Sequence, residues 1–371
     1  MNVLITGAGG FIGKNLFSNL SSTKGVTANG YFHGDSLATL KDIVGKADWI
    51  VHLAGVNRPD DVSEFKAGNS DLTSEICNIA SKCGKQIPII FSSSIQAGND
   101  TPYGKSKLEA EEHLKSYSVN TGSQVYIMRL PNVMGKWCRP NYNSAVATFC
   151  HNIARDLPIH VDDENKIISL NYIDDLVAKI KSVICGHEVF SNHVNFLEVE
   201  PVYEISLKFL VNTLVGFREG RPHLEIDQVG SGLIRALYAT YISYLDESDF
   251  SYTVESHTDD RGTFVEFLKT KESGQISYLT AKPGVTRGRH YHNTKTEKFL
   301  VVQGEGLFRY RQLHTEQYFE ISVSAANPTV VESIPGWAHD VTNTGHCDLI
   351  ILLWSSEVFD KDKPDTIPSE I

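Results

Sequence analysis

Residues 3–13 read VLITGAGGFIG, and this stretch decides the fold of the first part of the chain. A short apolar run ends at Thr6 and is followed directly by glycines at positions 7, 10 and 13. This spacing permits a tight turn after a strand and lets backbone amides of the next helix approach a pyrophosphate. We therefore predict a strand, a turn and a helix that bind a dinucleotide. The predicted contacts are Gly7, Gly10, Phe11, Ile12 and Gly13.

The same alternation continues downstream. Apolar runs at 49–53, 87–91 and 125–129 are separated by segments long enough for helices. Short, nearly continuous apolar strands of this kind are typical of a parallel sheet covered on both faces. The pattern predicts an α/β Rossmann-type domain over residues 1–243, in which the amphipathic run 202–214 forms a helix.

After residue 243 the pattern changes. The runs 262–268 and 349–354 suggest strands, and glycine and proline turns lie between such runs. Many strands with such turns favour an antiparallel barrel or sandwich, so an all-β domain is predicted over 244–371. Residues 360–371 are polar and contain proline, and we expect this tail to fray.

Composition excludes some classes of partner. The formal net charge is −11, whereas binding to nucleic acid needs a basic surface. The apolar run at the start is too short for a membrane span and lacks the layout of a signal peptide. The six cysteines form no CxxC pair, which is typical of free thiols in a reducing compartment. We predict a cytoplasmic protein with neither nucleic-acid nor membrane partners.

Tyr103 and Lys107 are four residues apart, so both side chains lie on one face of a helix. A free tyrosine has a pKa near ~10, and a neighbouring ammonium is expected to bring that value closer to neutrality. Ser94 closes the preceding strand and is placed to hydrogen-bond a reacting carbonyl. Together these residues suit proton transfer coupled to hydride transfer.

His290 and His292 are two residues apart, so they project from the same face of a strand. Glu297 follows on the neighbouring stretch, and His339 comes from a distant one. Three imidazoles and one carboxylate suit a divalent first-row metal, and zinc, nickel, iron and manganese are all compatible with this set. We predict a metal site, with zinc as the first candidate.

Residues 1–240 resemble the extended short-chain dehydrogenase/reductase family, which acts largely on nucleotide sugars. The resemblance rests on the glycine fingerprint, the serine-ended strand, the Tyr-Gly-Lys-Ser-Lys segment at 103–107 and later segments at 129–133 and 171–175. It implies Tyr103 as proton donor, Lys107 as its partner and ribose ligand, and Ser94 as a substrate contact. It also places a further set of residues at the cofactor, namely Leu53, Ala54 and Gly55.

Two departures narrow the chemistry. Family members that dehydrate sugars carry an Asp-Glu pair after the catalytic hydroxyl, but Ile95 and Gln96 follow Ser94 here. The second strand is expected to end near His33 without an acid at its tip, where an acid would hold the ribose 2′-hydroxyl of NAD. The sequence therefore favours a ketone reductase that uses NADPH, with His33 at the cofactor.

The second domain resembles the cupin superfamily. The segments 259–264 and 287–291 are also similar to those of deoxyhexulose epimerases, which epimerise 4-keto nucleotide sugars. That resemblance implies His290 as the base, although His290 also belongs to the predicted metal set. Arginines in these segments are candidates for diphosphate contacts, namely Arg261, Arg287 and Arg289.

The two resemblances together match a bacterial capsular or O-antigen family on the route to UDP-N-acetyl-L-fucosamine. They imply that the barrel epimerises C3 of a UDP-2-acetamido-2,6-dideoxy-4-hexulose and that the first domain reduces C4, giving UDP-N-acetyl-6-deoxy-L-talosamine. They also imply a homodimer. Two alternatives stay open: an NAD-dependent 4-epimerase with a cupin appendage, and a cupin that serves as a metal-braced dimerisation or sensing module.

Overall fold

A computed structural model describes residues 1–188, 190–315 and 317–371. The chain forms two compact units. The first comprises residues 1–215 and 235–245, and the second comprises residues 216–234 and 246–371. Residues 216–234 join the second unit because β10 (Glu225–Ile226) pairs with a strand of the barrel, β12 (Gly262–Thr270). The division at 243/244 stays a prediction.

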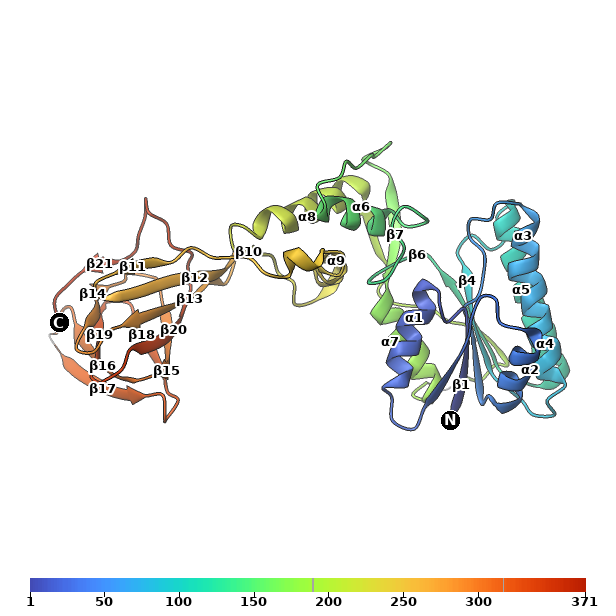
Figure 1. The fold of residues 1–371 in the computed structure, drawn as a ribbon, viewed down its shortest axis with the longest axis horizontal. Helices are drawn as coiled ribbons and strands as arrows, with labels where there is room; N and C mark the ends of the chain where they lie inside the picture. The colour runs from blue at the N-terminus through green and yellow to red at the C-terminus, as the bar shows by residue number, and fades with distance from the viewer. Residues whose placement is uncertain (189, 316) are drawn as a thin grey trace. The chain divides into compact units, whose positions relative to one another are not determined.

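The first unit is built on a parallel sheet of order β2-β1-β3-β4-β5-β8 (Figure 1). Its strands are rich in buried aliphatic residues because helices cover both faces. Helices α1 and α7 lie on one face and α2, α4 and α5 on the other (Figure 1). The predicted α/β Rossmann-type fold is confirmed. The strands are β1 (Asn2–Thr6), β2 (Thr27–Tyr31), β3 (Trp49–His52), β4 (Ile89–Ser94), β5 (Val125–Leu130) and β8 (Val194–Phe196).

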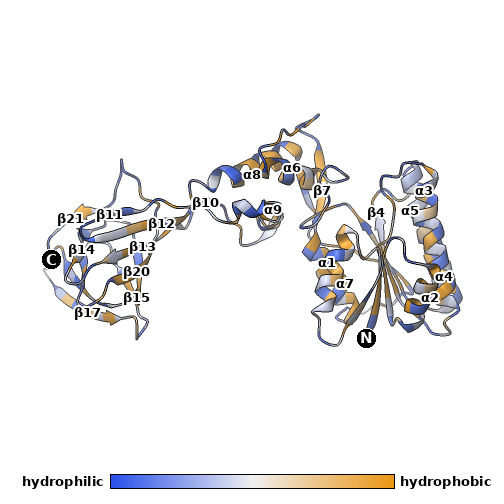
Figure 2. Cartoon of the chain, in the orientation of Figure 1, coloured by the Kyte–Doolittle hydropathy of each residue, from blue (hydrophilic) through white to orange (hydrophobic). Residues whose placement is uncertain are grey.

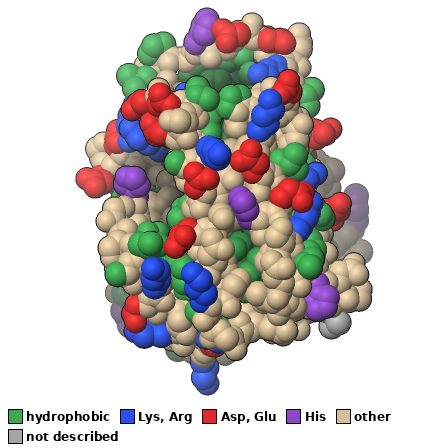
Figure 3. Space-filling view, turned by 90° about the vertical axis from the view of Figure 1, so that its right-hand side faces the viewer, with side chains coloured by type: hydrophobic (Ala, Val, Ile, Leu, Met, Phe, Trp, Pro, Cys, Tyr) green, Lys and Arg blue, Asp and Glu red, His purple; other side chains and the backbone are tan. Residues whose placement is uncertain are grey.

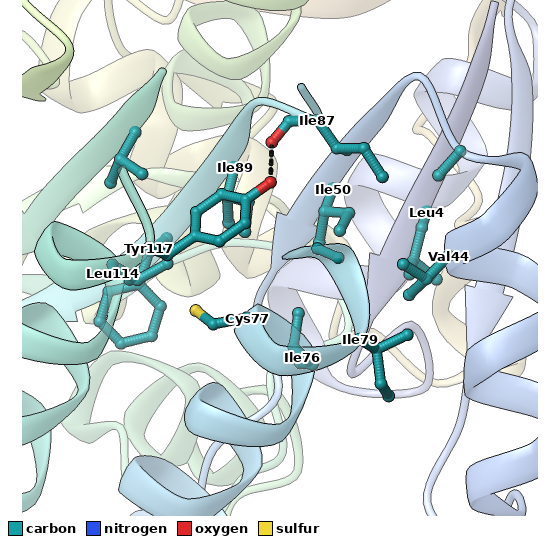
Figure 4. Packing of buried hydrophobic residues seen from close by; sticks show 14 of the residues in the cluster. Leu4, Val44, Ile50, Ile76, Cys77, Ile79, Ile87, Ile89, Leu114 and Tyr117 are labelled. Atoms are coloured by element: carbon teal, nitrogen blue, oxygen red, sulfur yellow. Dashed lines mark hydrogen bonds between the residues drawn. The ribbon is translucent and has the colours of Figure 1, made fainter. Parts of the chain in front are cut away.

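The helices of this unit have apolar and polar faces, as their mixed colouring shows (Figure 2). Their apolar faces meet the sheet in a buried cluster around Leu4, Ile50 and Ile89 (Figure 4). The helices are α1 (Phe11–Ser21), α2 (Leu37–Lys46), α3 (Ser63–Phe65), the π-helix η1 (Lys66–Asp71), α4 (Leu72–Ser81), α5 (Pro102–Thr121), α6 (Ala145–Ala154), α7 (Ile173–Ile184) and α9 (Gly232–Ile242). The outward face of α2, α4 and α5 carries charges of both signs scattered among apolar groups (Figure 3).

A small second sheet corrects one expectation. It has the order β6-β7-β9, with strands β6 (Asn132–Met134), β7 (Ile167–Tyr172) and β9 (Tyr203–Ser206). The predicted helix over 202–214 is therefore wrong at its start. Residues 203–206 pair with β7, and helix α8 occupies Leu207–Gly220. The apolar spacing of this run fits either structure, and strand pairing decides between them.

From residue 257 onward the described part of the second unit contains only strands, as predicted, and the short 3₁₀ helix η2 (Glu247–Phe250) precedes them. One sheet has the order β10-β12-β13-β20-β15-β18, with β11 paired to β12, and the other has the order β17-β16-β19-β14-β21. A core cluster that includes Phe299, Phe308 and Ile351 draws residues from both sheets. The remaining strands are β11 (His257–Asp259), β13 (Gly274–Ala281), β14 (Thr286–Tyr291), β15 (Glu297–Gln303), β16 (Glu305–Gln312), β17 (Tyr318–Ser324), β18 (Val330–Ser333), β19 (Trp337–Asn343), β20 (Leu349–Ser355) and β21 (Ile367–Pro368).

The tail differs from the expectation that it frays. Ile367–Pro368 forms strand β21, which pairs with β14 at Tyr291 and His290. Residues 360–364 are exposed, whereas Asp365 and Thr366 make hydrogen bonds to the barrel, and Asp365 makes the most of them. In the described ranges, no helix is long and apolar enough to cross a bilayer.

Tyr117 tests the packing of the first unit. Its ring lies in the cluster of Figure 4, and its hydroxyl donates to the Ile87 carbonyl at 2.8 Å. Tyr117→Phe should lower the free energy of unfolding by about 1–2 kcal/mol, because that carbonyl loses its buried partner. Urea titration of the full chain measures the change. Val119→Ala, at an 83% exposed position of the same helix, is the control and should stay within about 0.5 kcal/mol of wild type.

Candidate functional site

The turn after β1 and the turn after β3 meet where the strand order of the parallel sheet reverses. Gly7 has φ +67°, and a Cβ there would lie 2.7 Å from the Ala54 nitrogen. Ligands of open α/β sheets bind in the crevice at such a reversal. The structure thus brings the glycine turn and the predicted segment Leu53–Gly55 together at one crevice.

The start of α1 is open to an anionic group. Gly10 is the N-cap residue and has no side chain to cover the first amides of the helix. A Cβ on Gly13 would lie 2.1 Å from the Gly7 carbonyl oxygen, so only glycine lets the helix approach the turn this closely. Phe11 and Ile12 form the first turn of α1. This cradle fits the pyrophosphate of a dinucleotide.

Helix α5 positions Tyr103 and Lys107. Thr101 caps it by accepting a hydrogen bond from the Gly104 amide at 3.0 Å, so Tyr103 falls in the first turn and Lys107 in the second. The buried Lys107 ammonium donates to the Ser92 carbonyl at 3.0 Å. A Cβ on Gly55 would lie 3.2 Å from this ammonium, which places Lys107 beside the cofactor crevice.

The three serines that close β4 have different partners. The Ser92 hydroxyl donates to the His52 carbonyl at 3.3 Å, and the Ser93 hydroxyl donates to the Glu111 carboxylate at 2.5 Å. The Ser94 hydroxyl accepts from the Gln96 amide and interacts with Tyr103. Ser94 is therefore the serine that faces the tyrosine. Its role as a substrate contact stays a prediction.

The pKa values of the pair differ from the simple expectation. Burial raises the pKa of Tyr103, and hydrogen bonding to Ser94 only partly offsets this effect. Burial lowers the pKa of Lys107 to about 8, and the Glu111 carboxylate opposes that shift. The expected lowering of the tyrosine pKa by the lysine is thus not found, because desolvation dominates. Tyr103 keeps its proton at neutral pH, as a proton donor must.

The tip of β2 carries no free carboxylate. The strand ends at Tyr31, and Phe32 and His33 follow it as exposed residues. The Asp35 carboxylate accepts a hydrogen bond from the Phe32 amide at 2.7 Å, so it caps this turn. We predict that His33 takes the place of the acid that would hold a ribose 2′-hydroxyl. Its contact with the cofactor stays a prediction.

The second unit brings its four predicted ligands into one cluster. One donor atom from each of His290, His292, Glu297 and His339 lies within 4.8 Å of the others. His292 Nε2 is 3.0 Å and His339 Nε2 is 3.5 Å from Glu297 Oε2. The ring centroids of the three histidines lie 4.8 to 5.3 Å apart.

A β-bulge directs His290 into this cluster. Gly288 pairs with Asp340, but the next partner of β19, His339, pairs with His290. Arg289 is the extra residue, with φ +62°, and Gly288 leaves room for the Asp340 backbone. Without the bulge Arg289 would face His339, because a shift of one residue moves every side chain to the other face of a sheet.

The cluster fits a divalent cation. Among the described residues, neither ring nitrogen of the buried His339 makes a hydrogen bond, and Nε2 has only the Glu297 carboxylate 3.5 Å away. A buried imidazole without hydrogen bonds is costly, and ligation to a metal relieves that cost. Burial and the neighbouring histidines lower the pKa of His290 to about 4, so its imidazole is neutral at pH 7. Burial alone would raise the pKa of Glu297, but His292 and His339 hold it well below its usual range.

The cluster opens into a cavity of about 750 Å³. Of the three predicted arginines, Arg287 lines this cavity. Arg261 is exposed and paired with Asp259, and Arg289 is exposed on the bulge. The lining residues that sequence reasoning missed include the buried Lys295 and Thr366 of the tail. The position of Lys295 between His292 and Glu297 was an available signal, whereas Thr366 had none.

Comparison with known proteins extends over the whole chain. Residues 3–188 match the NAD dependent epimerase/dehydratase family, and residues 257–367 match the polysaccharide biosynthesis C-terminal domain. A UDP-2-acetamido-2,6-beta-L-arabino-hexul-4-ose reductase of Pseudomonas aeruginosa is 50% identical over 99% of this chain and 98% of its own length.

Solved structures give the same result. The capsular polysaccharide assembling protein CapF from Staphylococcus aureus is 43% identical, with a TM-score of 0.91 over 100% of both chains. A UDP-glucuronic acid 4-epimerase from Bacillus cereus, at 18% identity, covers 59% of this chain and 83% of its own with a TM-score of 0.52, and it shares the fold alone.

The fold and its crevice define a Rossmann-type enzyme that carries a β-barrel. The chain belongs to the NAD dependent epimerase/dehydratase family.

The histidine cluster can be tested by removing one of its four ligands. His339→Ala should weaken the binding of zinc by about 100-fold or more, because one of four ligands is lost. Equilibrium dialysis of chelator-treated protein against zinc measures this. His346→Ala, at an exposed position after the same strand, is the control. Equal zinc binding by the two variants would contradict the site.

Proposed function

We propose that this chain is a bifunctional nucleotide-sugar enzyme of capsular polysaccharide synthesis. The barrel epimerises C3 of a UDP-2-acetamido-2,6-dideoxy-4-hexulose, and the first unit reduces the C4 ketone with NADPH to give UDP-N-acetyl-6-deoxy-L-talosamine. The observation that carries this proposal is the 50% identity, over 99% of the chain, to a reductase of a UDP-linked hexul-4-ose. The proposal includes a cytoplasmic homodimer.

In the reduction, bound NADPH would supply the hydride for C4. The Tyr103 hydroxyl donates a proton to the C4 oxygen, and its raised pKa keeps that proton available at neutral pH. The Ser94 hydroxyl interacts with Tyr103 and holds the ketone oxygen beside it. The Lys107 ammonium gives the crevice a positive charge and would contact the ribose of a bound cofactor.

In the epimerisation, a proton leaves C3, negative charge develops on the C4 oxygen, and a proton then returns to the opposite face of C3. A divalent cation held by His290, His292, Glu297 and His339 would stabilise that charge. The neutral His290 imidazole lines the cavity. It has one free lone pair, which accepts the C3 proton when it does not bind the cation. Arg287 lies in the same cavity and provides a cation for the diphosphate.

Tyr103→Phe separates the two reactions. We expect NADPH oxidation to fall by about 10²–10⁴-fold, because the proton donor is lost. Exchange of the C3 proton into deuterated water should continue, since it takes place in the barrel. NMR of the UDP-4-keto sugar with and without NADPH measures both rates. Loss of the exchange as well would contradict the two-site proposal, and turnover without stoichiometric NADPH consumption would favour a 4-epimerase.

His33→Asp tests the choice of cofactor. A carboxylate at the tip of β2 repels a 2′-phosphate and accepts a hydrogen bond from a 2′-hydroxyl. We expect the ratio of kcat/KM for NADPH to that for NADH to fall by about tenfold or more, a change of ~1.4 kcal/mol in relative transition-state binding. His160→Asp, at an exposed position outside the crevice, is the control. An unchanged ratio would place the cofactor specificity elsewhere.

A further inference from the structure

The C-terminal segment 365–370 lies against the strand that carries His290. Strand β21 pairs antiparallel with β14, so that Pro368 is opposite His290 and Ile367 is opposite Tyr291. The Ser369 amide donates to the carbonyl of the bulge residue Arg289 at 2.9 Å. The segment therefore covers the edge of β14 beside the bulge that directs His290 inward.

The same segment determines which nitrogen of His292 faces the cluster. His292 Nδ1 is hydrogen-bonded to the Asp365 backbone carbonyl. A carbonyl oxygen can only accept, so Nδ1 carries the proton, and in the neutral imidazole Nε2 keeps its lone pair. Nε2 shares a hydrogen bond with Glu297 Oε2 at 3.0 Å, so whenever that nitrogen carries no proton its lone pair is directed into the cluster and can bind a cation there. Metal-binding histidines commonly use such an outer hydrogen bond to fix their ring.

The Asp365 carboxylate holds the loop between two of the ligands. It accepts hydrogen bonds from the backbone amides of Asn293, Thr294 and Lys295 at 2.9, 2.8 and 2.9 Å. The Thr294 hydroxyl and the Asn293 side-chain amide add bonds at 3.1 and 3.2 Å. This loop connects His292 to Glu297, so the carboxylate fixes the spacing between these two ligands.

Thr366 positions the Lys295 ammonium at the wall of the cavity. The buried Lys295 ammonium donates to the Thr366 hydroxyl at 2.8 Å, and both residues line the cavity. Asp365 thus holds the ligand His292 and the loop 293–295, and the next residue, Thr366, holds Lys295.

We propose that the C-terminal segment 365–370 is a positioning element of the barrel's metal site, with Asp365 as its central residue. The segment fixes the ring of His292, the loop 293–295 and the ammonium of Lys295. Because this inference rests on the metal site of the proposed function, its test begins with zinc binding by the wild-type chain.

The test compares Asp365→Ala, Asp365→Asn and the control Asp362→Ala in the full-length, chelator-treated protein. Asp362 is an exposed acid of the same tail, so its loss removes equal charge. Competition with a chromogenic chelator measures zinc affinity. We expect Asp365→Ala to weaken zinc binding about 10–100-fold, as loss of an outer-shell partner does. Asp365→Asn should lose less zinc affinity, because its side-chain oxygen still accepts hydrogen bonds from the loop 293–295. Asp362→Ala should bind zinc as tightly as wild type.

Hydrogen exchange gives a readout that needs no metal. In metal-free Asp365→Ala, the amides of residues 293–295 should exchange faster, while circular dichroism and amides of the barrel core stay as in wild type. Zinc affinity and exchange equal to those of wild type would overturn the inference and leave the metal site standing. Failure of the wild-type chain itself to bind zinc would overturn the metal site and this inference together.

Discussion

Burying an ionisable side chain costs free energy unless a partner replaces the water, and both functional sites keep such side chains inside. Lys107 is almost fully buried with a backbone carbonyl as its hydrogen-bond partner. His339 is buried with neither ring nitrogen bonded within the described residues. Each site therefore holds polar groups that a bound molecule or ion can satisfy. This shared constraint explains why burial dominates the pKa shifts of Tyr103, Lys107 and His290.

Backbone geometry delivers these side chains to their places. In the first unit, glycines at the reversal of strand order let the turns after β1 and β3 come together. In the barrel, the bulge at Arg289 exchanges an exposed arginine for His290 in the cluster. The tail then pairs beside that bulge and accepts the outer proton of His292. The metal cluster thus depends on hydrogen bonds outside the four ligands as well as on the ligands themselves.

Much of the fold and the candidate site could be predicted because their signals are local. The glycine spacing, the Tyr103–Lys107 interval and the paired histidines each reflect the period of one element. The predictions that were wrong concern segments whose structure depends on partners far away in the sequence. The run 203–206 became a strand because β7 was available, and the tail became ordered because β14 had a free edge. The direction of the Tyr103 pKa shift depends on burial, which the sequence around this tyrosine does not contain.

The order of the two proposed reactions follows from the acidity of C3. A proton on carbon can be removed here because the adjacent C4 ketone accepts the resulting negative charge as an enolate. Reduction converts that ketone to an alcohol and removes the acceptor, so C3 can no longer epimerise. Epimerisation must therefore precede reduction, and reduction makes the new configuration permanent. A reversible isomerisation followed by a hydride transfer that traps its product gives a chemical reason for one chain to carry both sites.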